Sequence, residues 1–465
     1  MKHARVLFWI LLLTAALPLL ALAEDSSPVM RQYEAGLEAL QPRLEALASC
    51  RTHPCINITT LDGQAILSKD EYVPSVVDVF NCDEAWRLTA EAGVKVRGNS
   101  TANDDEKPYR IKFTSRQSML GLHDGQAYKS WVLLRSSWNV VPDYTAFRLG
   151  RAILDDPYYV SDCMFVNLSI NGELKGVYLL CEQNQAARGR VTVYEPEDGE
   201  TGLSIGYLLE LDNYPTDEHP VVWIPAFPEV TDLAGQRSEI RGRAYSIKSD
   251  TVSPAQRRWI TNWMNGTFTI LYEASVNGKA MGRGRNGQAA FDPRDERTPW
   301  EAVCAVMDMD SLAEMLILEE LTHNYDVGEG SFYMAVDFSR GSLYPRLTFM
   351  APWDFNWAYD GDPQGGWYAA AFQPLAADWD RSNGWFVLAM RMPEFRELVR
   401  QHWRALREDD TLETVLDAVD AEADSLRGEI PASASWRIDA AHNVVTFVRG
   451  RIAWLDSQFL EDPEQ

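Results

Sequence analysis

The chain has 465 residues, which is enough for one large or two moderate hydrophobic cores. With 46% hydrophobic and 24% charged residues, its composition is that of a globular protein. The formal net charge of −25 disfavours binding to nucleic acid or to anionic membranes. Beyond keeping the chain soluble, such a charge favours cations and basic protein partners.

The first residues have the pattern of a secretory signal peptide. Lys2 and Arg5 give a positive start, residues 6–22 are almost unbroken apolar sequence, and Ala21-Leu22-Ala23 forms a small-x-small cleavage site. The apolar run is short and contains a proline, which argues against a retained membrane anchor. We therefore expect residues 1–23 to be removed, leaving a secreted chain of net charge −27 (−25 − 2). No later segment approaches ~18 consecutive apolar residues, so no transmembrane helix is predicted in the mature chain.

The mature chain is predicted to begin with an amphipathic helix and then to change to strands. Apolar residues recur at helical spacing from Val29 to Leu47, so residues 24–55 are assigned to a helix and linker. From Ile56 to about Leu211 the apolar period shifts towards two, which is typical of strands. Strands are predicted at 94–96, 109–113, 131–134, 165–170 and 176–180, with one helix at about 144–154.

Helices are predicted to dominate after Pro254. Their approximate ranges are 255–274, 309–322, 392–406, 412–427 and 442–459. Residues 331–357 interrupt them with a second hairpin-like region, and the polar, Gly- and Arg-rich residues 278–298 are expected to be a surface loop. A strand-rich part, about 56–250, followed by a helix-rich part, about 251–465, indicates an α+β fold rather than a doubly wound sheet.

All six cysteines lie after the predicted cleavage site, at Cys50, Cys55, Cys82, Cys163, Cys181 and Cys304. An even number of cysteines in an exported protein indicates disulfides, and the absence of a Cys-x-x-Cys pair argues against a zinc ribbon. Asn171-Gly172 indicates a hairpin between two predicted strands. A three-residue loop that includes Glu173 would set Cys163 opposite Cys181, whereas a two-residue loop would set Cys163 opposite Leu180.

We predict the Cys163–Cys181 disulfide on the first of these registers. Cys50 and Cys55 are close enough in sequence to pair locally, which leaves Cys82 and Cys304.

The most informative cluster of polar residues follows the predicted helix at 309–322. Asn324 and Asp326 come on the loop after this helix, and Asp354 follows 28 residues later (354 − 326) in the sequence Pro-Trp-Asp-Phe. Two carboxylates and a carboxamide from neighbouring loops can hold Mg²⁺, and a spare carboxylate can accept a hydroxyl proton during phosphoryl transfer. On spacing alone, Asn and Asp after a helix are also ordinary turn formers.

The chain resembles the spore-coat protein H (CotH) kinase family along most of its mature length. The matching segments are 94–101, 107–113, 131–134, 170–172, 176–180 with Glu182, 206–212, 310–326 and 352–356. The resemblance implies that residues 56–465 form an atypical protein kinase domain with a kinase-like bilobal fold. It also implies ATP and Mg²⁺ as cofactors and a protein substrate.

Carried over position by position, Asp326 resembles the catalytic-loop carboxylate of the family. Asn324 beside it looks like a metal or phosphate partner. Asp354 resembles the Asp of the kinase Asp-Phe-Gly triplet, which binds Mg²⁺ across the ATP phosphates. Many relatives continue Trp-Asp-Phe-Asp, whereas this chain has Asn356, an oxygen ligand without charge, so weaker metal binding is expected.

The cation that contacts the ATP phosphates is expected on the strand at 109–113. Lys112 and Arg110 alternate onto one face of this strand, and a strand Lys held by a Glu is the kinase arrangement, so we choose Lys112 with Glu182 as its holder. A solvated strand face would show the same alternation. The turn that begins at Arg97 is a second candidate for phosphate binding, although it also reads as a plain turn.

Two functions remain open on this evidence. The first is a secreted Mg²⁺/ATP-dependent kinase that phosphorylates Ser or Thr of extracytoplasmic proteins. The alternative is a catalytically silent cell-surface, adhesion or structural module that retains the fold. The presence of both Asp326 and Asp354 favours the kinase.

Overall fold

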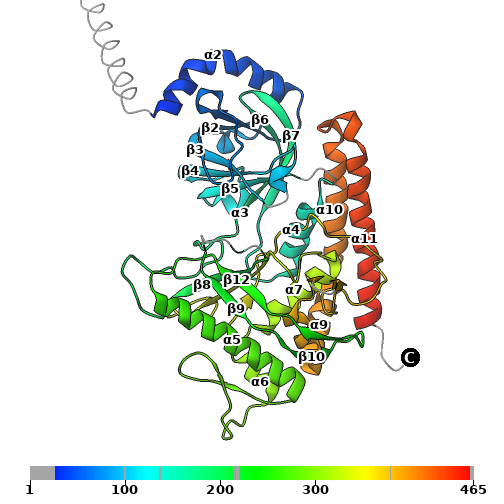
Figure 1. Ribbon diagram of the computed structural model, residues 1–465. Helices are drawn as coiled ribbons and strands as arrows, with labels where there is room; N and C mark the ends of the chain where they lie inside the picture. The colour runs from blue at the N-terminus through cyan, green and yellow to red at the C-terminus, as the bar shows by residue number, and fades with distance from the viewer. Residues whose placement is uncertain are drawn as a thin grey trace, which may run out of the picture. The chain divides into compact units, whose positions relative to one another are not determined.

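A computed structural model of the chain describes residues 27–98, 101–135, 139–213, 215, 219–376 and 379–460, without the side chains of 375, 376 and 379 (Figure 1). The predicted signal peptide lies outside the described residues. The chain divides into two compact units. Unit 1 takes its described residues from the ranges 1–137, 163–182 and 426–434, and unit 2 from 138–162, 183–425 and 435–465.

Unit 1 is built on a closed β-barrel (Figure 1). Its strands are β1 (Cys55–Thr60), β2 (Val73–Phe80), β3 (Leu88–Val96), β4 (Tyr109–Gln117), β5 (Tyr128–Leu134), β6 (Cys163–Ile170) and β7 (Glu173–Glu182). They follow one another in the order β1-β2-β3-β4-β5-β7-β6, and a parallel pairing of β1 with β6 closes the barrel. Closure satisfies the backbone groups that an open sheet would leave at its edges.

The predicted N-terminal helix is α2 (Pro28–Ser49), which contacts the barrel of unit 1. Ser27 accepts a hydrogen bond from the backbone N–H of Met30 and so caps the helix. Val29, Tyr33 and Leu40 are buried in one cluster with Val76 of β2. The apolar face identified from the sequence is therefore the face that packs on the sheet.

The β6–β7 hairpin has the predicted cysteine register but not the predicted loop. Its loop is the two-residue Asn171-Gly172, with φ values of 52° and 71°, so the three-residue loop is wrong. The register then shifts between Ser169, which faces Leu174, and Leu168, which faces Gly176. This β-bulge adds one residue to β7, and Cys163 consequently faces Cys181 after all.

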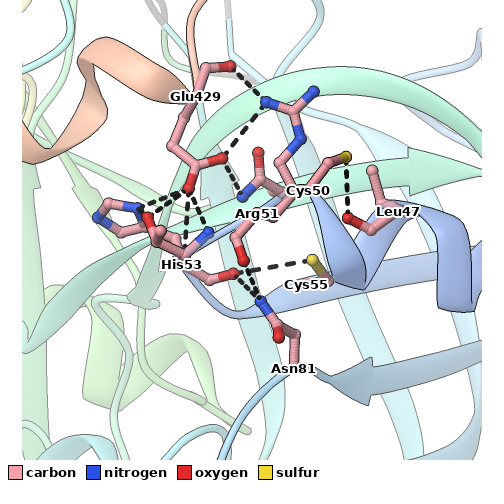
Figure 2. Close-up of polar contacts among 9 residues, drawn as sticks. Leu47, Cys50, Arg51, His53, Cys55, Asn81 and Glu429 are labelled. Atoms are coloured by element: carbon pink, nitrogen blue, oxygen red, sulfur yellow. Dashed lines mark hydrogen bonds and ion pairs between the residues drawn. The ribbon is translucent and has the colours of Figure 1, made fainter.

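A short segment from the C-terminal part of the chain completes unit 1. Between α10 (Thr411–Ser425) and α11 (Trp436–Phe459) of unit 2, residues 426–434 belong to unit 1. Figure 2 shows the carboxylate of Glu429 from this segment beside the residues that follow α2. It accepts hydrogen bonds from Thr52 N and Thr52 Oγ1 at 2.6 Å each and from His53 N at 3.1 Å. Arg51 Nη1 lies 2.9 Å from the Glu429 carbonyl oxygen.

Unit 2 has an antiparallel five-stranded sheet with helices around it. The strand order is β16 (Thr348–Phe349), β15 (Phe332–Asp337), β8 (Gly206–Leu211), β12 (Arg243–Ile247) and β9 (Val221–Ile224). Three short pairs complete its strands: β10 (Phe227–Thr231) with β11 (Arg237–Ile240), β13 (Gly282–Arg283) with β14 (Ala289–Ala290), and β17 (Pro374–Ala376) with β18 (Trp379–Asp380). The fold as a whole is α+β, with strands concentrated in the first half of the sequence and helices in the second.

The helices of unit 2, besides α10 and α11, are α4 (Pro142–Ile153), α5 (Pro254–Asn277), α6 (Pro299–Cys304), α7 (Met309–Thr322), α8 (Gly384–Met390) and α9 (Pro393–Leu406). Helix α7 agrees with its predicted range and is buried along almost its whole length, because α4, α9, α11 and β16 all contact it. It therefore fixes the position of whatever follows its C-terminus. Within the described ranges, no helix is both long and apolar enough to cross a membrane.

Candidate functional site

The candidate site in unit 2 begins where α7 ends. His323 adopts a left-handed conformation (φ 47°), and its N–H donates to the carbonyl of Glu319, so the helix stops after Thr322. The imidazole ring of His323 is buried and stacks on Tyr368 at a centroid distance of 4.2 Å. Burial lowers the pKa of His323 to about 3, so the ring is neutral and acts as an apolar anchor for the turn.

Asp326 lies in the turn that follows this anchor. The side-chain carbonyl of Asn324 accepts a hydrogen bond from Asp326 N at 3.2 Å, an Asx-type turn. The carbonyl of Asp326 in turn accepts from the N–H groups of Glu329 at 2.8 Å and Gly330 at 2.9 Å. These bonds hold the backbone on both sides of Asp326, so its half-buried carboxyl group is fixed in position.

Asp354 lies in the loop after β16, between two aromatic residues that anchor the loop. Trp353 is buried against Phe147 of α4 at a ring-centroid distance of 5.5 Å, and Phe355 is fully buried. The N–H of Phe355 also donates to the carboxylate of Asp143 at 2.9 Å. Asp354 itself is half-buried and has a φ of 65°, a conformation that only a well-determined loop maintains. The loop after the predicted hairpin thus holds Asp354 between two buried aromatic anchors.

Asp354 lies within electrostatic reach of Asp326. Burial raises the pKa of Asp326, and the charges of Asp354 and Glu329 raise it further, to about 7, while Arg381 opposes the rise. Two carboxylates in one site disfavour each other's charge unless a cation lies between or beside them. Asn356 also belongs to the site, because its amide nitrogen donates to Asp354 Oδ1 at 2.8 Å.

Glu319, one turn before the end of α7, supports the site from behind. Its side chain is buried, and burial raises its pKa to about 8, while a hydrogen bond from Asn324 opposes the rise. Glu319 is therefore mainly protonated at neutral pH, and it orients the amide of Asn324. That amide in turn binds the backbone of Asp326.

The oxygen groups of the site fit Mg²⁺ better than they fit a transition metal. The described part of the chain contains no group of three or more His, Cys, Asp or Glu side chains that could hold a metal ion. Mg²⁺ needs only one or two carboxylates, because it keeps waters and takes phosphate oxygens as further ligands. Asp354, Asp326 and the amides of Asn324 and Asn356 supply such hard oxygen donors.

The residues predicted to contact the phosphates lie in unit 1. On β4, Tyr109, Ile111 and Phe113 are buried, so Lys112 and Arg110 occupy the other face as predicted. Lys112 is exposed, and its Nζ lies 5.9 Å from the centre of the Tyr72 ring. Arg110 Nη2 lies 3.5 Å from Ser130 Oγ on β5.

Glu182, predicted to hold Lys112, is on the opposite face of the sheet. The strand register aligns it with Trp131, which is aligned with Ile111 rather than with Lys112. Its carboxylate instead lies 2.8 Å from His123 Nδ1. The structure therefore does not bring Lys112 and Glu182 together as a pair.

Arg97, the other predicted phosphate contact, follows β3, and its N–H donates to the Pro108 carbonyl at 3.1 Å. Gly98 after it has a φ of 87°. Asn99 and Ser100 of the same turn lie outside the described residues.

No sequence motif predicts a role for Glu319, Glu329 or Arg381. Glu319 lies in a helix that is buried on almost every side, so its burial is a consequence of α7 being central rather than of a local motif. Arg381 comes 55 residues after Asp326 (381 − 326), in a segment without a recognisable motif. Tertiary structure alone brings it to the site.

A family model described as CotH kinase protein matches residues 94–263 and 289–444 of the chain. The match covers most of the chain and includes α7, Asp326 and Asp354. No curated protein matches the sequence.

Proposed function

Because the chain belongs to the CotH kinase protein family, we propose that it is an ATP-dependent protein kinase of the extracytoplasmic space. Family membership supports a kinase-like function. The finer proposal is Mg²⁺-dependent transfer of the γ-phosphoryl group of ATP to a Ser or Thr hydroxyl of a protein.

One feature supports this proposal most: the carboxyl group of Asp326 is half-buried, and its burial and the charge of Asp354 raise its pKa to about 7. A general base works best when its pKa is near the operating pH. A pair of carboxylates that repel each other also attracts a divalent cation, which removes the repulsion. The site thus combines a proton acceptor with a place for a metal.

Each residue then has a separate role. Asp326 accepts the proton of the attacking hydroxyl, and Asn324, held by Glu319, keeps the Asp326 backbone in place. Asp354 and the amide of Asn356 supply oxygen ligands for Mg²⁺. The bound Mg²⁺ would neutralise charge that develops on the phosphates of ATP during transfer.

Two further parts of the proposal rest on the sequence. Lys112, with Arg110 and Arg97 as alternatives, is proposed as the cation for the ATP phosphates, since a strand lysine has this role in protein kinases. Secretion is proposed from the apolar leader at residues 1–23. The net negative charge of the chain makes basic proteins the favoured substrates.

The test is a phosphoryl-transfer assay on the purified mature chain with γ-labelled ATP and Mg²⁺. We expect label on the chain itself or on a basic model protein, and we expect Asp354→Asn to abolish it. The matched control is Asp439→Asn, because Asp439 is an exposed carboxylate on α11.

Melting curves separate loss of the metal ligand from loss of the fold. Mg²⁺ and ATP together should raise the Tm of the wild type and of Asp439→Asn but hardly that of Asp354→Asn. Absence of label in the wild type, with and without Mg²⁺, would leave the silent surface module as the better interpretation. Equal stabilisation of Asp354→Asn would remove Asp354 from the metal site.

A further inference from the structure

Arg381, which follows β18, is a buried cation beside the acidic site. The residue is only 8% exposed, and its guanidinium carbon lies 3.3 Å from the centre of the Tyr325 ring. Tyr325 directly precedes Asp326, and the positive charge of Arg381 lowers the pKa of Asp326. The guanidinium therefore lies within electrostatic reach of the proposed base.

Two nitrogen atoms of this guanidinium, Nε and Nη1, are buried without a hydrogen-bond partner in the described part of the chain. The group also contacts the hydroxyl of Tyr368. A buried guanidinium with unused N–H groups is unfavourable, because it has lost its hydration and gained too little in return. Proteins retain such a group where a ligand supplies the missing acceptors.

The backbone around Arg381 is tightly held against the loop of Asp326. Its N–H donates to the Gln373 carbonyl at 3.1 Å. Asn383 Nδ2 donates to the Val327 carbonyl at 2.8 Å. At Gly328, even an added Cβ would collide with the carbonyl oxygen of Arg381, so the two loops are in backbone contact. Arg381 is thus as well positioned as Asp326 itself, which a binding group requires.

We propose that Arg381 is an anion-binding residue of this site and donates hydrogen bonds to an oxygen of a phosphoryl group. That the anion is a phosphoryl group rests on the proposed function. That the site binds an anion rests on Nε and Nη1 of Arg381, which have no hydrogen-bond partner among the described residues. The attacking hydroxyl and the transferred phosphoryl group must both approach Asp326, so a donor beside this carboxylate faces the reacting oxygens. Without such a cation, Asp326, Asp354 and Glu329 would repel the phosphoryl group.

The experiment compares the buried Arg381 with the half-buried Arg283, each of which is stacked on an aromatic ring. Arg283 lies 4.3 Å from the Trp263 ring, but both of its Nη atoms have hydrogen-bond acceptors: Nη1 donates to two backbone carbonyls at 3.0 and 2.6 Å, and Nη2 donates to Thr267 Oγ1 at 2.5 Å. Lysine keeps the charge and loses the planar set of donors. We therefore compare Arg381→Lys and Arg381→Met with Arg283→Lys.

A positioned donor to the transition state contributes about 10²–10³-fold to turnover. Arg381→Met should lose this factor, and Arg381→Lys should recover only part of it. Both should melt within a few degrees of the wild type, since no hydrogen bonds of Nε or Nη1 are lost. Arg283→Lys should instead lower the Tm and leave turnover at the wild-type value. A large fall in Tm for Arg381→Lys, with turnover per folded molecule unchanged, would make Arg381 structural and overturn the proposal.

Binding of inorganic phosphate tests the anion site without any catalysis. Phosphate should raise the Tm of the wild type and of Arg283→Lys with concentration, but not that of Arg381→Met. If it stabilises neither the wild type nor Arg283→Lys, or if it stabilises Arg381→Met equally, the anion site is refuted. If phosphate binding depends on Arg381 while the wild type transfers no label, the anion site stands and the kinase proposal fails. If Arg381→Met transfers label at the wild-type rate, the kinase proposal stands and the role of Arg381 in phosphoryl binding fails.

Binding of ADP and ATP with Mg²⁺ identifies the source of the phosphoryl group. Weaker binding of ATP but not ADP in Arg381→Met assigns Arg381 to the γ-phosphoryl group. Unchanged binding of both, with the response to inorganic phosphate lost, assigns it to the phosphorylated side chain of the product.

Discussion

At the scale of single residues, the acidic site contains carboxyl groups that the folded protein prefers to keep protonated. Burial and neighbouring negative charge raise the pKa of Asp326 to about 7, whereas an unfolded chain has the ordinary value of 3.8. Between these two values the folded state binds more protons than the unfolded state. The stability of the metal-free protein therefore falls as pH rises from about 4 to about 7. Such destabilisation is expected where a charge is kept for function.

Asp326→Asn should therefore be more stable than the wild type above pH 7, by at most about 4 kcal/mol, and equally stable near pH 4. The reason is that Asn removes a carboxylate that the fold disfavours. Urea unfolding at a series of pH values, with a chelator present, measures the difference. Asp439→Asn, which changes an exposed carboxylate, should show no such trend above pH 5. A constant difference between Asp326→Asn and the wild type across this range would contradict the raised pKa.

Two adjacent glutamates at the end of α7 should differ in how much stability the protein loses when each is replaced by Gln. Glu320 forms a buried ion pair with Arg451 at 2.5 Å, with side chains 1% and 0% exposed. Glu320→Gln leaves the Arg451 charge uncompensated and should cost about 3–5 kcal/mol of stability. Glu319→Gln should cost less than about 1.5 kcal/mol, because the pKa of about 8 makes Glu319 already neutral at pH 7.

Turnover distinguishes the role of Glu319 from a purely structural one. Glu319→Ala removes the partner of Asn324 and should lower kcat about 10–100-fold with little change in KM, while Glu319→Gln should rescue most of the loss. Thermal melts and steady-state kinetics of the four proteins test both expectations. If Glu320→Gln is as stable as the wild type, or if Glu319→Gln fails to rescue kcat, the assignment of these two residues is wrong.

At the scale of secondary-structure elements, local sequence patterns predicted most of the longer helices and strands. They could not predict which distant strands pair. The apolar periodicity of α2 and the alternation of β4 specify these elements directly, because burial acts on each residue through its own position. Helices α6 and α8 are short, with 6 and 7 residues, and neither gives a periodic signal of useful length. Closure of the barrel depends on β1 pairing with β6, about 110 residues away, which leaves no local trace.

The same limit applies to the candidate site. Asp326 and Asp354 lie in short motifs and could be predicted from them. Arg381 and Glu319 enter the site through tertiary packing, so their residue types carry no signal in sequence. The pairing of Lys112 with Glu182 failed for a related reason: strand alternation fixes the face of each residue, but strand register decides which residues share a face.

The β6–β7 hairpin carries a prediction about its cysteines. Cys163 lies directly opposite Cys181, and Cα atoms of such pairs are roughly 4.5–5.5 Å apart, within the range that a disulfide spans. We expect this disulfide when the protein is made in an oxidising compartment. Replacing both cysteines by Ala should then cost about 3 kcal/mol of stability, the value for a loop of this length.

Peptide mapping without reduction checks the disulfide, and reduction of the same digest is its control. A single linked peptide containing Cys163 and Cys181 supports the register. Recovery of either cysteine as an alkylated thiol from the oxidised protein would rule it out. The same map tests the remaining predicted pairs, Cys50 with Cys55 and Cys82 with Cys304.

At the scale of the whole molecule, the chain passes between the two compact units five times, since each unit takes three separate stretches of sequence. The last stretch of sequence in unit 1 is the segment 426–434, and Glu429 holds it there. The carboxylate of Glu429 is bound by Thr52 and His53, and Asn167 Nδ2 of β6 also donates to it at 3.1 Å. Figure 2 shows this carboxylate beside His53. One side chain thus joins residues that are 377 positions apart in sequence.

This arrangement makes Glu429 a determinant of stability at neutral and mildly acidic pH. Burial alone would raise its pKa, but hydrogen bonds from Thr52 and His53 outweigh burial and lower the pKa to about 2. The ionised form is therefore favoured in the folded state, relative to the ordinary value of 4.5. Its contribution is fully present above about pH 5 and is lost as pH falls towards 2.

Glu429→Gln should accordingly destabilise the protein by about 1.5–3 kcal/mol at pH 7, the range for hydrogen bonds to a charged group, and by progressively less below pH 4. Glu397→Gln is the control: Glu397 pairs with Arg400 on the surface at 2.8 Å, and such exposed pairs contribute about 0–1 kcal/mol. Urea unfolding of the three proteins from pH 7 to pH 3 measures both effects. Because Glu429 holds a segment that the chain reaches only after residue 425, a chain truncated at that residue should lose at least as much stability as Glu429→Gln. Equal stability of Glu429→Gln and the wild type at pH 7 would show that the Glu429 carboxylate does not hold the 426–434 segment in unit 1.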